Sequence, residues 1–253
     1  MPTTRVCLWA GPRSLATPLM YAFGQRADTQ VLDEPLYGHY LQTTGVAHPG
    51  RTEVLAQVEV KAEKAIYEEM LGACPSEVLF IKNMAHHLVG LNLEFLEDLE
   101  NIFLIRHPRE VLPSLSTHIP NPTLLDSGYK MLHDLYQYLV RQGKSPLVID
   151  AQSLQTQPEM VLRHICGRIG LAYDPAMMQW AAGGLEKEGI WGKYWYKRLH
   201  KTTGFSYPTA AYAEFPEKLA GLLETCEPYY LRLYRQAQRV SPPPAWSLDL
   251  SLN

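Results

Sequence analysis

The stretch Leu8-Trp-Ala-Gly-Pro-Arg-Ser-Leu-Ala-Thr-Pro18 joins an apolar run to a helical pattern, and its role decides how the rest of the chain is interpreted. A loop in this place can hold a phosphate, because backbone N–H groups at the start of a helix point at an anion. It is nevertheless a poor match to the phosphate-binding pattern G-x-x-x-x-G-K-[ST]. With Gly11 as the first glycine, the second glycine, the lysine and the metal-binding hydroxyl are replaced by Ala16, Thr17 and Pro18.

Five short apolar runs follow one another along the chain, and polar or turn residues close each of them. Both faces of these runs are apolar, which is typical of buried parallel strands. The runs are Val6–Ala10, Gln30–Asp33, Val78–Lys82, Asn101–Arg106 and Leu147–Asp150. Helical patterns occur at Leu19–Gln25, Glu53–Leu71, Leu88–Leu99, Leu124–Arg141 and Pro158–Gly170. This alternation predicts an α/β fold with a doubly wound, mostly parallel five-stranded sheet flanked by helices.

The length of 253 residues and the hydrophobic content of 46% suit one α/β domain, which we place at residues 1–240. Residues 182–213 show no clear periodicity, and such a stretch inside a compact domain is typical of a lid or binding loop. A last helix is predicted from Glu214 to Arg239. Residues 241–253 begin with Ser-Pro-Pro-Pro-Ala-Trp and form a predicted proline-rich tail.

Charge and cysteine content exclude several classes of protein. The net charge of −3 gives no global positive field for nucleic acid or an anionic membrane, so an anion site must be a local cluster. Four widely spaced cysteines argue against zinc and disulfide frameworks. The N-terminus lacks the features of a signal peptide, and no run approaches the roughly 18 apolar residues of a membrane span. We expect a cytoplasmic protein that binds neither nucleic acid nor membrane; a homodimer remains open.

Charged residues gather where the predicted strands end. The strand ends read Gly11-Pro-Arg-Ser14, Asp33-Glu34-Pro35, Lys82-Asn83 and Arg106-His-Pro-Arg109. Ligands of doubly wound sheets bind outside the carboxyl ends of the strands. These stretches therefore predict the position of the functional site.

Two of these stretches resemble motifs of the PAPS-dependent sulfotransferases, where PAPS is 3′-phosphoadenosine 5′-phosphosulfate. Gly11–Thr17 is similar to their 5′-phosphosulfate loop, a Lys or Arg followed by Ser-Gly-[ST]-[ST]. Arg106 and Ser114, eight positions apart, resemble their 3′-phosphate motif. The resemblance covers most of the chain and is strongest to a branch in bacteria and plants, some members of which are labelled branched-chain aminotransferase-like. It implies a P-loop NTPase-like sulfotransferase fold and transfer of a sulfuryl group from PAPS to a hydroxyl or amine of a small-molecule acceptor.

The resemblance also implies which residues bind the nucleotide. Arg13 would supply charge to the 5′-phosphosulfate, and Leu15 stands where the family usually has glycine. The predicted nucleotide-binding residues are Arg13, Ser14, Ala16, Thr17, Arg106, Ser114, Lys197, Arg198 and Lys201. Each motif alone has a structural interpretation: Thr17 can cap a helix that opens at Pro18, and Arg106 can pair with a carboxylate. Pro113 also fits poorly inside a helix that starts at Pro108.

The basic segment that contains Lys197, Arg198 and Lys201 falls where sulfotransferases carry a loop over the nucleotide. Its aromatic residues Trp191, Trp195 and Tyr196 would wall the acceptor or stack on adenine. A surface segment whose aromatic residues pack on the core remains the alternative.

The base that activates the acceptor has two candidates. Many cytosolic sulfotransferases place a histidine two residues beyond the lysine that ends the third strand, but Met84 stands there. By resemblance to glycan and bacterial members, Glu34 is the predicted base, with Lys82 stabilising charge on the leaving oxygen. His86 is the rival base; its neighbour His87 and the more distant His118 are weaker candidates.

We predict no metal site, because no carboxylate or cysteine recurs at ligand spacing beside the histidines. Two other functions remain open. A P-loop kinase shares the fold class but needs magnesium and a lysine on the phosphates. A non-catalytic nucleotide-binding protein derived from a sulfotransferase is the second alternative.

Overall fold

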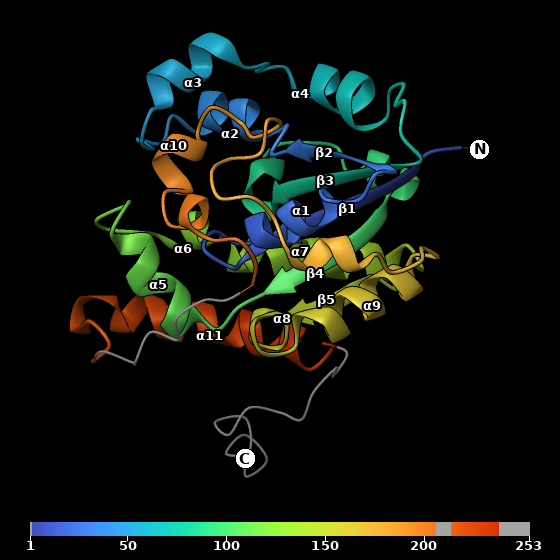
Figure 1. Ribbon diagram of the computed structural model, residues 1–253. Helices are drawn as coiled ribbons and strands as arrows, with labels where there is room; N and C mark the ends of the chain where they lie inside the picture. The colour runs from blue at the N-terminus through green and yellow to red at the C-terminus, as the bar shows by residue number, and fades with distance from the viewer. Residues whose placement is uncertain (1, 206–213, 238–253) are drawn as a thin grey trace.

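The computed structural model describes residues 2–205 and 214–237 and contains one parallel sheet of five strands (Figure 1). The strand order is β2-β3-β1-β4-β5, and β1 pairs with β3 on one side and with β4 on the other. The strands are β1 (Thr4–Ala10), β2 (Thr29–Asp33), β3 (Val78–Met84), β4 (Glu100–Ile105) and β5 (Leu147–Asp150). The predicted five-stranded α/β sheet is confirmed.

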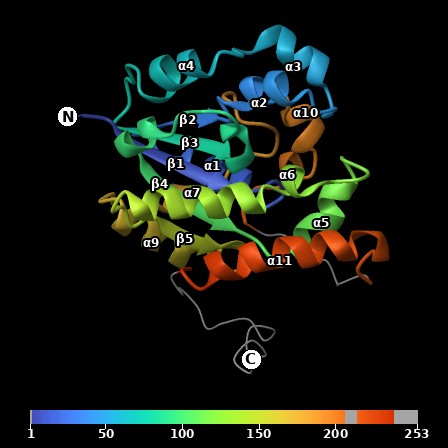
Figure 2. The ribbon, with the colours of Figure 1, turned by 180° about the vertical axis from the view of Figure 1, so that it is seen from behind.

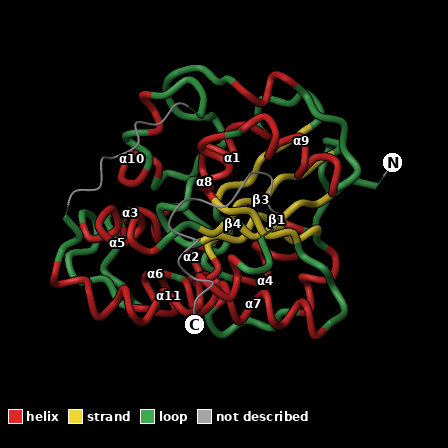
Figure 3. Tube along the Cα trace, turned by 90° about the horizontal axis from the view of Figure 1, so that it is seen from below, coloured by secondary structure: helices red, strands yellow, loops and turns green. Residues whose placement is uncertain are grey.

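Helices cover both faces of this sheet. The α-helices of the described chain are α1 (Ala16–Phe23), α2 (Tyr37–Thr44), α3 (Arg51–Gln57), α4 (Ala62–Lys64), α5 (Pro108–Ser116), α6 (Leu124–Ser127), α7 (Tyr129–Arg141), α8 (Ala151–Thr156), α9 (Pro158–Arg168), α10 (Gly192–Trp195) and α11 (Ala220–Tyr234). Helices α1, α8 and α9 lie on one face, and α7 and α11 lie on the other (Figures 2 and 3). Alternate side chains of β1 therefore enter two cores, with Leu8 on the α1 side and Trp9 on the α7 side.

The prediction of one helix over Glu53–Leu71 is wrong, because the chain is extended between α3 and α4. A close backbone contact explains the break: a Cβ atom added to Gly38 would lie 2.3 Å from the carbonyl oxygen of Glu59. The Glu59 side chain then accepts the N–H groups of Val60 and Lys61 at 3.0 and 2.9 Å. A π-helical turn at Ala65–Met70 follows α4.

Two further predicted helices are interrupted by glycines in the left-handed region, which glycine adopts without steric cost. Residues 88–99 form no α-helix, and two 3₁₀ turns, Ala85–Leu88 and Glu94–Asp98, flank Gly90 at φ +73°. Gly128 at φ +74° separates α6 from α7. By contrast, α5 continues through Pro113, so the misfit expected there does not end the helix.

The segment after α9 is more regular than its sequence indicates. Between residues 182 and 205 it forms α10 and a 3₁₀ turn at Leu199–Lys201, two regular elements that the sequence did not predict. Tertiary contacts fold it, among them a bond of 2.9 Å between His200 Nε2 and Glu188 Oε2. Residues 206–213, 238–239 and the predicted tail 241–253 lie outside the described residues. Within the described ranges, no helix is long and apolar enough to cross a membrane.

Candidate active site

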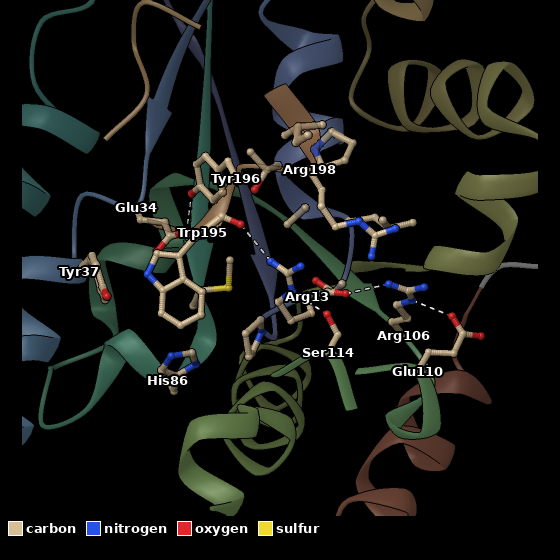
Figure 4. A pocket seen from close by; sticks show the side chains of 18 of the residues that line it. Arg13, Glu34, Tyr37, His86, Arg106, Glu110, Ser114, Trp195, Tyr196 and Arg198 are labelled. Atoms are coloured by element: carbon tan, nitrogen blue, oxygen red, sulfur yellow. Dashed lines mark hydrogen bonds and ion pairs between the residues drawn. The ribbon is translucent and has the colours of Figure 1, made fainter. Parts of the chain in front are cut away.

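A cavity of about 240 Å³ opens at the carboxyl ends of the strands (Figure 4). Arg13 follows β1, Glu34 follows β2, His86 follows β3 and Arg106 follows β4, and all four line this cavity. Residues 195, 196, 198 and 199 close it from the segment around α10. The structure thus brings the predicted strand ends together at one place.

The loop after β1 has an unusual backbone. Arg13 and Leu15 have φ values of +60° and +70°, in the left-handed region that costs a non-glycine residue roughly 1–2 kcal/mol. Leu15 therefore has a backbone conformation that favours glycine, the residue expected there from the resemblance. Helix α1 begins at Ala16, directly after Leu15, so the prediction that Thr17 caps a helix opening at Pro18 is wrong. No side chain caps α1, which leaves its N-terminus suited to an anion.

Arg13 connects two motifs that the resemblance assigns to opposite ends of the nucleotide. Its Nε donates to Ser114 Oγ at 2.9 Å, and its Nη1 donates to the carbonyl of Trp195 at 3.0 Å (Figure 4). Burial, together with the charges of Arg198 and Arg106, lowers the pKa of the Arg13 guanidinium. Three cations are therefore held near one another in a cavity that would gain from an anionic ligand.

Arg106 already has protein partners. Its Nε donates to Glu110 Oε2 at 2.7 Å, and its Nη1 donates to the carbonyl of Arg13 at 3.0 Å. The carboxylate pairing that the sequence left open is therefore present. A phosphate bound at Arg106 would share the guanidinium with Glu110.

The structure separates the three predicted basic residues of the α10 region. Arg198 lines the cavity, whereas Lys197 and Lys201 are exposed and are not part of its lining within the described chain. Tyr196 also lines the cavity. Trp191 is buried, and its Nε1 donates to the Tyr196 hydroxyl at 3.1 Å.

A buried ionic cluster supports Glu34. The ammonium group of Lys82 is 0% exposed and donates to Asp33 Oδ1 at 2.8 Å and to Glu34 Oε1 and the Tyr196 hydroxyl at 2.5 Å each. Burial lowers the pKa of Lys82, but the two carboxylates outweigh it and leave this pKa above its ordinary value. Lys82 is not among the residues that line the cavity. Sequence reasoning missed Tyr196 as a partner of Glu34 because 162 residues separate them.

Histidines line the same cavity as Glu34. His86 and His87 are buried, and burial holds the pKa of both well below its ordinary value, so both are neutral at pH 7. His87 Nε2 lies 3.9 Å from Glu34 Oε2. His48, which no motif indicated, also lines the cavity, and its Nδ1 is 3.0 Å from the Tyr37 hydroxyl.

The remaining histidine candidate lies behind the wall of the cavity. His118 stacks on Trp195 with ring centroids 4.9 Å apart and is not among the lining residues. In residues 2–205 and 214–237, no three His, Cys, Asp or Glu side chains converge as a metal site would require.

A sequence model of the sulfotransferase domain matches residues 4–237 of this chain. The chain belongs to the sulfotransferase domain family. Two solved sulfotransferase domains share its fold. The domain from the curacin biosynthetic pathway has a TM-score of 0.51 and 15% identity, over 93% of this chain and 97% of that one. The domain from the Synechococcus PCC 7002 olefin synthase has a TM-score of 0.50 and 17% identity, over 88% and 94%. The sulfotransferase fold predicted from the sequence is confirmed.

Two curated relatives of this sulfotransferase domain come from Arabidopsis thaliana. Branched-chain-amino-acid aminotransferase-like protein 1 is 37% identical over 245 residues, which is 94% of this chain and 44% of that protein. Branched-chain-amino-acid aminotransferase-like protein 2 is 38% identical over 223 residues, which is 88% of this chain and 40% of that protein. The chain therefore spans less than half the length of these relatives.

Proposed function

We propose that this sulfotransferase domain transfers a sulfuryl group from PAPS to a hydroxyl or amine of a small molecule. The observation that carries the proposal is the convergence of Arg13, Arg106 and Arg198 on one cavity beside the uncapped start of α1. PAPS is anionic on both its 5′ and 3′ sides, and guanidinium groups bind phosphate oxygens in pairs. An aminotransferase needs a lysine that reaches its cofactor, and within the described chain no lysine lines the cavity.

The residues fit the donor nucleotide in two groups. Arg13, Ser14 and Thr17 with the α1 N-terminus would hold the 5′-phosphosulfate, and Arg106 with Arg198 would hold the 3′-phosphate. PAPS supplies the sulfuryl group, whose transfer depends on positioning and charge stabilisation, as phosphoryl transfer does. Arg13 is the cation best placed to stabilise charge on the leaving phosphate group of the donor, because Lys82 is buried and already paired with Asp33 and Glu34.

The acceptor would enter at the Glu34 end of the cavity. Glu34 would take the proton of the acceptor hydroxyl or amine as its heteroatom bonds to sulfur. Tyr37, His48 and Trp195 form the wall around this point, an uncharged and largely aromatic surface that suits a small organic acceptor.

Calorimetric titration of PAP and ADP, with and without EDTA, tests the donor. A 3′-phosphate held by charged groups contributes about 1.5–3 kcal/mol per bond, so PAP should bind at least about tenfold tighter than ADP. Arg106→Ala should remove most of this advantage and leave ADP binding nearly unchanged. Arg109→Ala is the matched control, because Arg109 lies three residues away, is exposed and does not line the cavity.

Two other outcomes would contradict the proposal. Equal affinities, or ADP binding that depends on magnesium, would overturn the proposal and favour a kinase. If neither nucleotide binds, the enzymatic assignment fails. If PAP binds as expected, incubating the protein with PAPS and a metabolite mixture, followed by a search for sulfated products, would identify the acceptor.

A further inference from the structure

Tyr196 reaches from the segment after α10 into the ionic cluster below the cavity (Figure 4). Its hydroxyl lies 3.0 Å from Glu34 Oε1 and 3.2 Å from each carboxylate oxygen of Asp33. Lys82 Nζ and Trp191 Nε1 lie 2.5 and 3.1 Å from the same hydroxyl. Five polar atoms therefore surround one phenolic oxygen.

The inventory of donors and acceptors fixes the direction of these bonds. A lysine ammonium and an indole N–H can only donate, so Lys82 and Trp191 occupy both lone pairs of the Tyr196 oxygen. The single hydroxyl proton must then go to a carboxylate, and Glu34 Oε1 is the nearest oxygen. Burial and the charges of Asp33 and Glu34 raise the pKa of Tyr196 well above its ordinary value, so this proton is present at neutral pH.

This arrangement makes the two oxygens of Glu34 unequal. Oε1 accepts from both Lys82 and Tyr196. Oε2 is 3.9 Å from His87 Nε2, which is beyond hydrogen-bond distance. Oε2 is therefore the oxygen with lone pairs available for an acceptor proton.

The segment that carries Tyr196 also contacts the Arg13 side of the cavity. The carbonyl of Trp195, the residue before Tyr196, accepts Arg13 Nη1 at 3.0 Å. Further back, the N–H of Gly189 donates to Asp33 Oδ2 at 3.1 Å. Residues 189–196 thus contact the loop after β1 and the carboxylates after β2 at the same time.

We propose that Tyr196 is a positioning residue, which holds Glu34 so that Oε2 meets the acceptor and couples this orientation to the folding of residues 189–196 over the cavity. The proposal rests on the proposed function, because it assumes that Glu34 takes the acceptor proton. A hydroxyl that only fixes the segment in place would affect nucleotide binding and turnover together. A hydroxyl that positions the base affects turnover alone.

Tyr196→Phe is the first test, because it removes the hydroxyl and keeps the ring. We expect kcat to fall about tenfold or more and the affinity for PAP to stay within about twofold, because the base would lose its orientation and the nucleotide site would not change. Tyr67→Phe is the control, because Tyr67 is 64% exposed, lies outside residues 189–196 and does not line the cavity; it should change none of these quantities.

A second readout does not need activity. Side-chain carboxyl ¹³C NMR, with the Glu34 signal assigned from Glu34→Gln, observes this carboxylate directly, and its chemical shift should change in Tyr196→Phe because Oε1 loses one of its two donors. If wild type transfers no sulfuryl group, the proposed function fails while this measurement still tests the positioning role. Should Tyr196→Phe not fold, Trp191→Phe removes a donor to the hydroxyl without touching Glu34, and a smaller change in kcat is expected. An unchanged kcat with an unchanged Glu34 chemical shift, or a parallel loss of PAP affinity, would overturn the proposal.

Discussion

At the scale of single residues, backbone strain is concentrated in the cavity wall. Among the described residues, the non-glycine residues with positive φ are Arg13, Leu15 and Glu34, and all three line the cavity. Such conformations persist only where surrounding contacts enforce them. The N–H of Glu34 donates to the Lys82 carbonyl at 2.7 Å, and the Arg13 side chain is fixed by Ser114. Contacts within the chain thus hold the strained residues of the cavity wall in place.

The role proposed for Glu34 leads to a prediction about turnover. Glu34→Gln keeps the size of the side chain but removes its ability to take a proton, so turnover should fall by roughly 10²-fold or more. Affinity for PAP should stay unchanged, because the base would touch the acceptor and not the nucleotide. Steady-state assays and calorimetry on the same preparation measure both. An active Glu34→Gln beside an inactive His86→Ala would assign the base to His86 instead.

At the scale of elements, the strands could be predicted from the sequence and many helices could not. A buried parallel strand is apolar on both faces, so a short run of apolar residues in the sequence is enough to predict it. The break between α3 and α4 arises because the backbone at Glu59 packs on Gly38, a contact between distant segments. Predicted site residues at strand ends share a cavity because parallel strands align their ends. Tyr37 and His48 come from other elements, and no spacing in the sequence reveals them or the contact between Tyr196 and Glu34.

The start of α1 provides a test of strain at this scale. The backbone of Leu15 lies in the left-handed region. Alanine at this position would keep the backbone strain, whereas glycine would relieve it. Leu15→Gly should therefore be more stable than Leu15→Ala by about 1 kcal/mol, although glycine in a helix interior is less stable than alanine by a similar amount. Denaturant unfolding of the two variants measures the difference. Greater stability of the alanine variant would show that the loop relaxes to an ordinary conformation.

At the scale of the whole molecule, one buried acid makes stability depend on pH. Asp150 ends β5, and its carboxylate accepts the Gln152 N–H at 2.9 Å and the Tyr230 hydroxyl of α11 at 3.0 Å. Burial raises the pKa of Asp150 from 3.8 to about 6. The folded protein therefore binds this proton more tightly than the unfolded chain, so the stabilisation is full below about pH 4 and is lost as pH rises through about 6.

Asp150→Asn isolates this effect, because asparagine can accept the same bonds and does not titrate. Between pH 4 and pH 7, the free energy of unfolding of wild type should fall by roughly 2 kcal/mol relative to Asp150→Asn. Denaturant unfolding of both proteins across this range provides the measurement. A difference that stays constant with pH would mean that Asp150 has an ordinary pKa in the folded protein.

The central position of β1 has a consequence for how the protein is made. Thr4 of β1 pairs with Val78, and Val6 pairs with Glu100, so both neighbours of the first strand are synthesised long after it. At roughly 5–20 residues per second, a ribosome needs on the order of 4–15 s to extend the chain from β1 to β3. During that time an apolar segment has neither partner, and we expect the yield of folded protein in a cell to depend on chaperones that bind such nascent segments.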